Sequence, residues 1–451
     1  MKRLITGNLL KLAESCGFPL YVVGGAVRDY IAGLGSGGGD VDICAPASAD
    51  SLCACAEKCG AHVNAVYRNT GTVKLSFGAE EYEFASFRSD EYVRGTHTPV
   101  KTFFTEDITL DARRRDFKCN AVYYDIKGDK YLDPLGGIAD IESGRISAVA
   151  DADKVFGEDG LRLMRLARQS AQTGFIPTED CIGGALANSG LIADVAPERI
   201  YAELDLILHA DLKYGVAGGQ FKGLEILSET RVLDRILPEL TAGRGMEQNP
   251  AYHNYDVLGH SLRAVLYADN SVRLAALLHD VGKPYCKIRN GNYHAHEEES
   301  ARIARDICAR YRVGKRLTAE TVRLCALHMY DLKCDARESK IRRLIVNNAD
   351  IYEKLLLVKQ ADYSACKDDL SVAPCVVKWN AIMEKMKSDG TPFNTGMLAV
   401  RGDGLIAEGI PPEAVGKILN LLLNDCAVQP SLNSREKLTE RALSYYRTGK
   451  F

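Results

Sequence analysis

Two aspartates near the N-terminus, Asp40 and Asp42, have the residue type and spacing of a metal site. They stand in the sequence DVDI, which is typical of a strand, and alternate residues of a strand point to the same face. Two carboxylates on one face repel each other unless a cation lies between them. Mg²⁺ prefers carboxylate oxygens together with the phosphate oxygens of a substrate. The pair therefore predicts a Mg²⁺ site that acts on a phosphate-containing substrate.

A glycine turn precedes this pair. Val23 ends an apolar run, Gly24 and Gly25 permit a sharp turn, and the sequence AVRDYIAGL then has the pattern of a helix that begins at the glycines. Backbone N–H groups at such a turn are unpaired and bind phosphate oxygens, and Arg28 lies within the first turn or so of the helix. We expect Gly25 and Arg28 to hold phosphates, whereas residues 37–39 read as flexible spacing.

The periodicity of the apolar residues divides the chain into a strand-rich front and a helical remainder. Residues 20–145 alternate short β-branched or aromatic runs with turns. From EDGLRLMRLARQSAQTGF onward, apolar residues recur three and four apart, as in helices. Breaks at 240–254 and 366–375 divide the helical part. The predicted domains are a head over 1–148, a neck over 149–240, a third domain over 241–370 and a tail over 371–451.

The composition of the 451 residues sets few limits on function. A formal net charge of −3 means that local basic clusters would have to meet any RNA partner. No run approaches the roughly 18 consecutive apolar residues of a membrane helix, so we expect a cytoplasmic location and no membrane partner. The spacing of Cys53, Cys55 and Cys59 does not fit a structural zinc site, and the fourteen cysteines favour a reduced, intracellular chain.

Four motifs, in chain order over about residues 20–180, carry a family resemblance. They are the glycine turn with its Asp-x-Asp pair, the segment RRDFKCNAV, the connector YLDPLGG and the segment EDGLRLMRLARQSAQTGF. Together they resemble the class II tRNA nucleotidyltransferases and bacterial poly(A) polymerases of the polymerase-beta-like nucleotidyltransferase superfamily. The resemblance implies an α+β fold in which a small mixed-sheet nucleotidyltransferase head is followed by an all-helical neck, an HD domain and a tail.

The resemblance also implies the chemistry of the head. In nucleotide addition, the RNA 3′-hydroxyl attacks the α-phosphate in line and pyrophosphate leaves. Asp40 and Asp42 would be the catalytic carboxylates that hold Mg²⁺. This superfamily usually has a third carboxylate, for which Glu83 is the candidate because a neighbouring strand could place it beside the pair. Glu81 and Asp116 compete for that assignment.

Two further motifs supply expected nucleotide contacts. Arg115 of RRDF would bind phosphate as a fork, and Asp116 would accept from a ribose hydroxyl. In EDGLRLMRLAR, residues three apart would lie on one helix face and offer donors and acceptors to a base. Proteins of this family are held to select CTP and ATP there without a nucleic-acid template. The residues given this role are Asp159 and Arg162, followed on the same ridge by Arg165 and Arg168, which would reach the triphosphate or the RNA end.

Three positions depart from the pattern of the family. Gly160 stands where proline is usual, Gln169 stands where phenylalanine is usual, and Lys118-Cys119 replaces Thr-Ile. None of these changes removes a polar group from the expected chemistry, but they weaken conclusions about fine specificity.

The histidines indicate a second site, because six of the nine lie between residues 253 and 328. Their order resembles the His, His-Asp, Asp series of HD phosphohydrolase domains, which bind divalent metals such as Mg²⁺, Mn²⁺, Ni²⁺ or another transition metal. The ligands implied are His260, His279, Asp280 and Asp362, with His296 and His328 for a second ion or its bridging phosphate.

The leading interpretation is template-independent addition of CCA, from CTP and ATP, to the 3′ end of tRNA, with an HD phosphatase or phosphodiesterase as a side activity. An A-adding tRNA nucleotidyltransferase, a poly(A) polymerase and a protein that is mainly an HD phosphohydrolase are the alternatives. The last segment, SREKLTERALSYYRTGKF, has five basic and two acidic residues and resembles a tRNA-contact helix, which favours tRNA as the partner. The loop region between Phe87 and Thr105 argues against a CC-only enzyme. The oligomeric state does not follow from the sequence.

Overall fold

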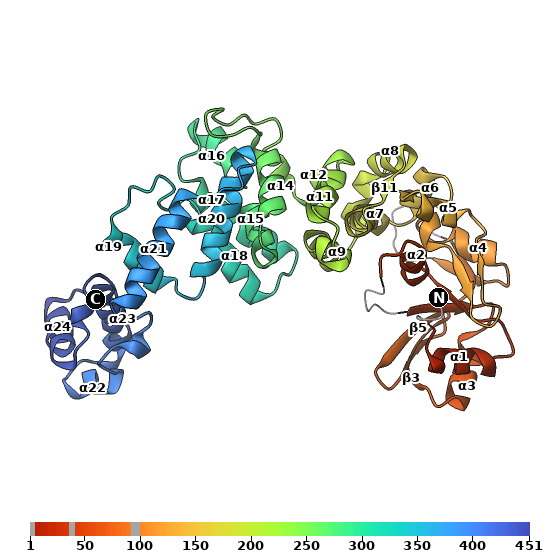
Figure 1. The fold of residues 1–451 in the computed structure, drawn as a ribbon, viewed down its shortest axis with the longest axis horizontal. Coiled ribbons are helices and arrows are strands. Elements are labelled where there is room, and N and C mark those ends of the chain that lie inside the picture. Colours follow the sequence, from red (N-terminus) through yellow and green to blue (C-terminus); the bar gives the residue numbers. More distant parts are fainter. Residues whose placement is uncertain (1–4, 36–40, 92–99) are drawn as a thin grey trace. The chain divides into compact units, whose positions relative to one another are not determined.

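The computed structural model describes residues 5–35, 41–91 and 100–451 (Figure 1). It divides into two compact units. The first comprises Met1–Thr241 with Ala309–Val313, and the second comprises Ala242–Cys308 with Gly314–Phe451. The first unit combines one mixed sheet with helices and the second is helical, which confirms the predicted α+β class.

A seven-stranded sheet forms the front of the first unit, in the order β3-β4-β5-β2-β1-β8-β9. Its strands β2 and β5 run parallel, and the other neighbours run antiparallel. The sheet is therefore mixed, as predicted. The strands are β1 (Tyr21–Val23), β2 (Val41–Ala45), β3 (His62–Tyr67), β4 (Thr72–Phe77), β5 (Glu80–Ser86), β8 (Tyr123–Asp125) and β9 (Lys130–Leu132).

Short helices and a hairpin complete the head. An aromatic cluster joins the sheet to the hairpin, since Phe87 stacks on Tyr21 with ring centroids 5.6 Å apart and meets the edge of Tyr123 at 5.8 Å. The helices are α1 (Gly7–Ser15), α2 (Gly25–Ile31), α3 (Ala49–Lys58), α4 (Ile108–Arg113) and α5 (Gly137–Glu142), and the hairpin pairs β6 (Arg88–Glu91) with β7 (Lys101–Phe104).

The neck is helical apart from a short parallel pair, β10 (Arg145–Ile146) with β11 (Ile176–Pro177). Its helices α7, α9 and α11 pack on one another through buried apolar faces. The helices are α6 (Ala152–Glu158), α7 (Leu161–Thr173), α8 (Glu179–Ala187), α9 (Pro197–Leu208), α10 (Asp211–Tyr214), α11 (Gly219–Glu229), α12 (Val232–Ile236) and α13 (Pro238–Thr241).

One sequence prediction is wrong in this region. The segment beginning at Glu158 is not one helix, because Asp159 adopts an extended conformation (φ −142°, ψ 107°) between α6 and α7. The chain also comes very close to the 3-10 helix η2 (Ser189–Asp194) here, and a Cβ on Gly160 would lie only 2.6 Å from the carbonyl oxygen of Leu191. Asp159 therefore precedes the helix that carries Arg162 and does not share a helix face with it.

The second unit has only helices among its ordered elements, in residues 242–308 and 314–451. A continuous hydrophobic core runs through it, and the buried Trp379 stacks on Tyr352 at its centre, with ring planes 8° apart. The α-helices are α14 (Val257–Tyr267), α15 (Arg273–Leu278), α16 (Lys283–Asn290), α17 (His296–Arg310), α18 (Lys315–Leu327), α19 (Glu338–Asn347), α20 (Tyr352–Lys367), α21 (Pro374–Ser388), α22 (Gly402–Ala407), α23 (Pro412–Val428) and α24 (Arg435–Thr448).

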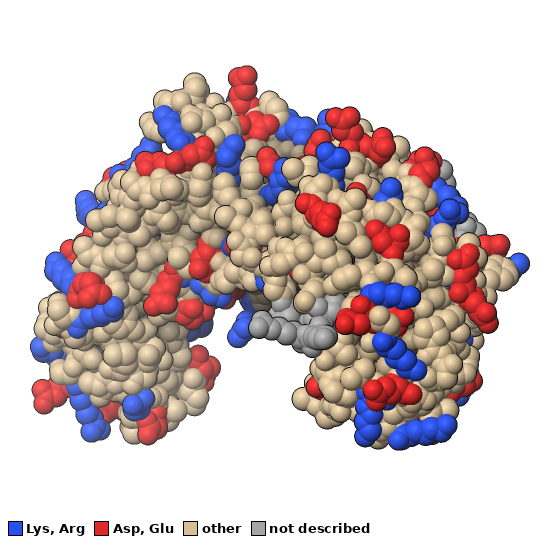
Figure 2. Space-filling view, turned by 45° about the vertical axis from the view of Figure 1, so that its right-hand side comes forward, with Lys and Arg blue, Asp and Glu red and all other residues tan. Residues whose placement is uncertain are grey.

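Surface charge is mixed on the face shown in Figure 2, where acidic and basic side chains alternate. All fourteen cysteines are free thiols. Among the described residues, no helix combines the length and the apolar character that crossing a membrane requires.

Candidate nucleotide pocket and metal centre

A polar pocket of about 400 Å³ lies within the first unit. Seven arginines and one lysine line it against three aspartates, so its charge suits an anionic ligand such as a triphosphate. Most of the residues predicted for nucleotide addition meet here. The predicted residues in the lining are Gly25, Arg28, Asp42, Arg115, Asp116, Asp159, Arg162, Arg165 and Arg168.

The glycine turn brings Asp42 to the pocket. Gly24 has φ +82°, a conformation that favours glycine, and a Cβ there would lie 3.2 Å from Asp42 Oδ2. Glu83 is the register partner of Asp42 on the parallel strand β5, but its carboxylate is half exposed, lies 3.4 Å from Lys74 Nζ and is not part of the pocket lining. Asp40 lies outside the described residues, as do residues 37–39.

Arg28 is held rigidly at the base of the pocket. It is 5% exposed, and its Nε and Nη2 donate to Asp29 Oδ1 at 2.8 and 2.6 Å. Nη1 donates to Asn120 Oδ1 at 2.9 Å and to Gln169 Oε1 at 3.2 Å. Burial alone would lower the pKa of Arg28, but the charge of Asp29 outweighs it and raises the pKa. The guanidinium is therefore a fixed positive charge.

Asp116 accepts several hydrogen bonds at the centre of the pocket. Arg165 donates to its Oδ2 from Nε at 2.8 Å and from Nη2 at 2.6 Å, and Gln169 Nε2 donates to the same oxygen at 3.2 Å. Asn120 Nδ2 and the Phe117 N–H donate to Oδ1. Burial alone would raise the pKa of Asp116, but the charge of Arg165 and these hydrogen bonds hold it well below its ordinary value.

Asp111 is a functional neighbour that the sequence reasoning missed. Its carboxylate is fully buried and accepts from Arg114 Nε at 2.8 Å, from Arg115 Nη2 at 3.1 Å and from the Tyr123 hydroxyl at 2.7 Å. Arg115 also donates to the Tyr123 oxygen at 3.2 Å. Asp111 thus orients the two arginines of RRDF that line the pocket. The sequence does contain a signal for this contact: Asp111 lies three residues before Arg114 and four before Arg115, the spacing of ion pairs on a helix.

Asp159 and Arg162 line the pocket from the junction of α6 and α7. Asp159 directly precedes Gly160, the N-cap of α7, and its Oδ1 accepts from the first backbone N–H of the helix at 2.9 Å. The buried Arg162 donates to the Val155 carbonyl at 2.9 Å, to Glu158 Oε2 at 3.0 Å and to the Arg114 carbonyl at 2.8 Å. Glu158 therefore orients Arg162.

Further cations extend the pocket toward α9 and α10. Arg168 is oriented by Glu203, whose Oε2 accepts from Nε at 2.6 Å. Arg199 and Lys213 also line the pocket, and burial lowers the pKa of Lys213. Neither residue is predicted from the sequence, because their place at the pocket depends on how α9 and α10 pack against α7.

A second cluster of ligand-type side chains lies in the second unit, and all six predicted residues meet in it. His260 Nε2 is 3.1 Å from His279 Nε2, 3.1 Å from Asp362 Oδ1 and 3.3 Å from Asp280 Oδ2. Asp280 Oδ1 lies 3.2 Å from His296 Nε2 and 3.6 Å from His328 Nε2. The two oxygens of Asp280 thus face two groups of ligands.

The ring orientations in this cluster fit metal binding. The Nδ1 atoms of His279, His296 and His328 each lie 2.7 Å from a backbone carbonyl, which directs each Nε2 inward. Within the described residues, the buried Nε2 atoms of His296 and His328 make no hydrogen bond. Lys283 Nζ lies 2.6 Å from Asp280 Oδ2. A cavity of about 740 Å³ opens beside Asp280, so a substrate has access.

Two family models match parts of the chain that contribute to the two sites. Residues 20–147 match the Poly A polymerase head domain, and residues 253–355 match the HD domain. Among similar proteins, a CCA-adding enzyme of Geobacillus thermodenitrificans is 35% identical over 248 residues, which cover 54% of this chain and 57% of that protein. The chain thus spans about half the length of that relative. An A-adding tRNA nucleotidyltransferase of Deinococcus radiodurans is 28% identical over 363 residues, which cover 77% of this chain and 76% of that protein.

Solved structures match along nearly the whole chain. The crystal structure of the Bacillus stearothermophilus CCA-adding enzyme in complex with CTP has a TM-score of 0.66 at 21% identity and covers 98% of both chains. The Thermotoga maritima CCA-adding enzyme complexed with tRNA_CCA has a TM-score of 0.61 at 19% identity, over 98% of this chain and 95% of that one. This chain has the same fold as these structures.

Proposed function

We propose that this chain, whose residues 20–147 match the Poly A polymerase head domain, adds CCA to tRNA 3′ ends without a template, using CTP and ATP. The observation that carries the proposal is the arginine-rich pocket, which gathers nine of the predicted residues. The names of its relatives, and neighbours described with CTP, ATP or tRNA, support the same substrates.

Two aspartates are the proposed metal ligands of the head. The carboxylate of Asp42 at the pocket wall, with Glu83 beside it in register, fits the oxygen ligands that Mg²⁺ prefers. We assign Asp40 and Asp42 as ligands of Mg²⁺ and Glu83 as the third carboxylate. Bound there, the metal would lower the pKa of the RNA hydroxyl and neutralise charge on the α-phosphate.

The remaining pocket residues bind and orient the nucleotide in this proposal. Gly25 lines the pocket, where a Cβ would lie 3.5 Å from Arg28 Nη2, and Arg28, Arg165 and Arg168 hold the triphosphate as fixed cations. Such fixed charges stabilise a transition state without having to reorganise. The residues assigned to the phosphate and ribose are Arg115 and Asp116, and those assigned to the base are Asp159 and Arg162.

The order of addition tests this proposal directly. Purified protein is incubated with tRNA ending before the first C, after one C and after two C residues, each with CTP, ATP or both. We expect CTP alone to extend the first two substrates up to the second C and ATP alone to extend only the third. An A-adding enzyme would leave the first two unchanged, and a poly(A) polymerase would add many adenylates. Either result contradicts the proposal.

We propose a catalytic head over 1–148, a base-selecting neck over 149–240, an HD domain over 241–370 and a tRNA-contacting tail over 371–451. The helix α24, with its basic residues, supports a contact between the tail and RNA phosphates.

A second activity, metal-dependent hydrolysis of a phosphate ester, is favoured by the geometry of the HD cluster. Four buried histidines lie within 3.6 Å of the carboxylate of Asp280, Asp362 lies 3.1 Å from His260 Nε2, and a cavity opens beside the cluster. Imidazole and carboxylate together suit Mn²⁺, Ni²⁺ or another transition metal as well as Mg²⁺. His260, His279, Asp280 and Asp362 would hold one ion, and His296 and His328 would complete a second site with the other oxygen of Asp280.

A further inference from the structure

The four histidines of the HD cluster differ in what their outer nitrogens contact. In His279, His296 and His328 the Nδ1 atom lies 2.7 Å from a backbone carbonyl. His260 is fully buried, yet its Nδ1 has no hydrogen-bond partner within the described residues. Buried polar atoms nearly always have a partner, and an exception requires an explanation such as an ion. The outer nitrogen of His260 is such an exception.

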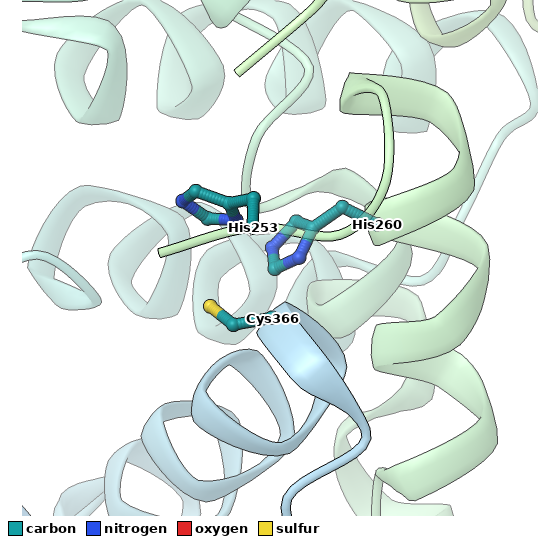
Figure 3. Close-up of side chains that lie close together, drawn as sticks. All are labelled: His253, His260 and Cys366. Atoms are coloured by element: carbon teal, nitrogen blue, oxygen red, sulfur yellow. The ribbon is translucent and has the colours of Figure 1, made fainter. Parts of the chain in front are cut away.

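His253 and Cys366 lie beside the imidazole ring of His260. The ring centroids of His253 and His260 are 5.1 Å apart, with planes at 87°, and His253 Nδ1 is likewise buried without a partner in the described part of the chain. Candidate ligand atoms of His253, His260 and Cys366 all lie within 4.8 Å of one another. Figure 3 shows the two imidazoles and the thiol grouped around a common space.

We propose that His253, His260 and Cys366 form a further metal site that takes Zn²⁺ or a similar borderline transition metal. A thiolate with two imidazoles is a donor set for such ions and a poor one for Mg²⁺. Three protein ligands also leave a fourth coordination position for water or another ligand. The thiol of Cys366, which now donates to the Asp362 carbonyl at 3.3 Å, loses its proton when the metal binds.

The site is adjacent to the HD centre and shares the ring of His260 with it. His260 Nε2 lies within 3.3 Å of atoms of His279, Asp280 and Asp362, so Nδ1 is the nitrogen left for the further metal. When both sites are filled, the ring releases its remaining N–H proton to solvent and binds as an imidazolate. His253 and Cys366 both line the 740 Å³ cavity, which gives an ion a path to the site. The proposal does not depend on nucleotide addition or on phosphate-ester hydrolysis.

Cobalt substitution gives a direct test. The full chain is stripped of metal and titrated with Co²⁺, which shows a thiolate-to-metal charge-transfer absorption in the near ultraviolet only when a cysteine is a ligand. We expect this absorption in the unaltered chain and its loss in Cys366→Ser and His253→Gln. Zn²⁺ titration of Cys366→Ser should bind about one ion fewer per chain. Cys334→Ser is the matched control, because Cys334 is a partly buried thiol of the same unit, and it should keep the absorption.

A further variant separates the proposed site from the HD centre. His279→Ala removes a ligand of the HD centre only, so the charge-transfer absorption should remain in that variant. Circular dichroism and thermal unfolding of every variant establish that it is folded. Absence of the absorption in the folded unaltered chain, its persistence in Cys366→Ser or its loss in His279→Ala would each overturn the proposal.

Discussion

Gln169 links the two halves of the nucleotide pocket. Its Oε1 accepts from Arg28 Nη1 at 3.2 Å and from Asn120 Nδ2 at 2.8 Å, while its Nε2 donates to Asp116 Oδ2 at 3.2 Å. The pattern of the family places phenylalanine at this position. An apolar ring can make none of these bonds, so this chain positions its pocket through a buried polar contact.

Replacing Gln169 by phenylalanine should therefore harm this protein even though the new residue fits the pattern of the family. Removing hydrogen bonds to the charged Arg28 and Asp116 should lower the free energy of unfolding by about 2 kcal/mol and raise KM for CTP more than it lowers kcat. Urea unfolding and steady-state kinetics measure both. Gln169→Met, which keeps the chain length but not the bonds, should behave in the same way. Unchanged stability and KM in both variants would show that the contact is dispensable.

Asp111 gives the head a pH-dependent contribution to stability. Burial alone would raise the pKa of Asp111, but Arg115 and Arg114 outweigh it and lower the pKa below the ordinary 3.8. A carboxyl whose pKa is lower in the folded state stabilises the protein above its unfolded pKa and loses that contribution as pH falls through the folded pKa. Asp111→Asn should thus cost about 3 kcal/mol at pH 7. Urea unfolding should show the difference shrinking as pH falls below about 4. A difference that does not change with pH would contradict this assignment.

The break between α6 and α7 places Asp159 and Arg162, the residues proposed to select the base. It turns Asp159 out of the helix and lets its carboxylate accept from the first backbone N–H of α7. The α7 side chains of Arg162, Arg165 and Arg168 then line one pocket. The turn depends on Gly160 because the Leu191 carbonyl occupies the space where a side chain would begin.

Gly160→Ala should accordingly destabilise the neck by about 1–3 kcal/mol, since its φ of −59° is ordinary and only the steric overlap is new. It should also reduce addition of CTP and ATP, because Asp159 and Arg162 move. The matched control is Gly183→Ala in α8, where no atom lies within 4 Å of the added Cβ. That variant should be stabilised by about 0.5–1 kcal/mol. Thermal unfolding measures the melting temperature of each variant against that of the unaltered chain. Equal changes in melting temperature for the two variants would contradict the steric explanation.

Helices and strands could be predicted from the sequence where residues close together in the chain determine them. The alternation of β-branched runs predicts a strand-rich head, and the glycine turn before α2 has the residues that a left-handed φ demands. The break at Asp159 was not predictable, because it depends on a contact with Leu191, 31 positions after Gly160. The same holds for Arg199 and Lys213, which reach the pocket only through the packing of the neck helices.

At the scale of the molecule, two units hold two separate sites. The nucleotide pocket is lined by residues of the first unit, and the HD cluster is formed by residues of the second. His279→Ala should therefore abolish metal-dependent hydrolysis of a probe such as a 2′,3′-cyclic nucleotide and change the rate of CCA addition by less than about twofold. Parallel assays of both reactions on one preparation measure this. A large loss of CCA addition in the folded variant would show that the sites are coupled.

Asp40 and Asp42 are the residues proposed to carry nucleotide transfer. The most direct test measures the incorporation of labelled CTP and ATP into tRNA that lacks CCA. Three proteins are compared: the unaltered chain, the double variant Asp40→Ala with Asp42→Ala, and the control Asp50→Ala. The double variant should lose about a thousandfold in rate, because it loses the carboxylates that would hold Mg²⁺. Asp50→Ala, whose carboxylate is 64% exposed in a surface ion pair, should keep its rate. Incorporation by the folded double variant at the rate of the unaltered chain would contradict the account.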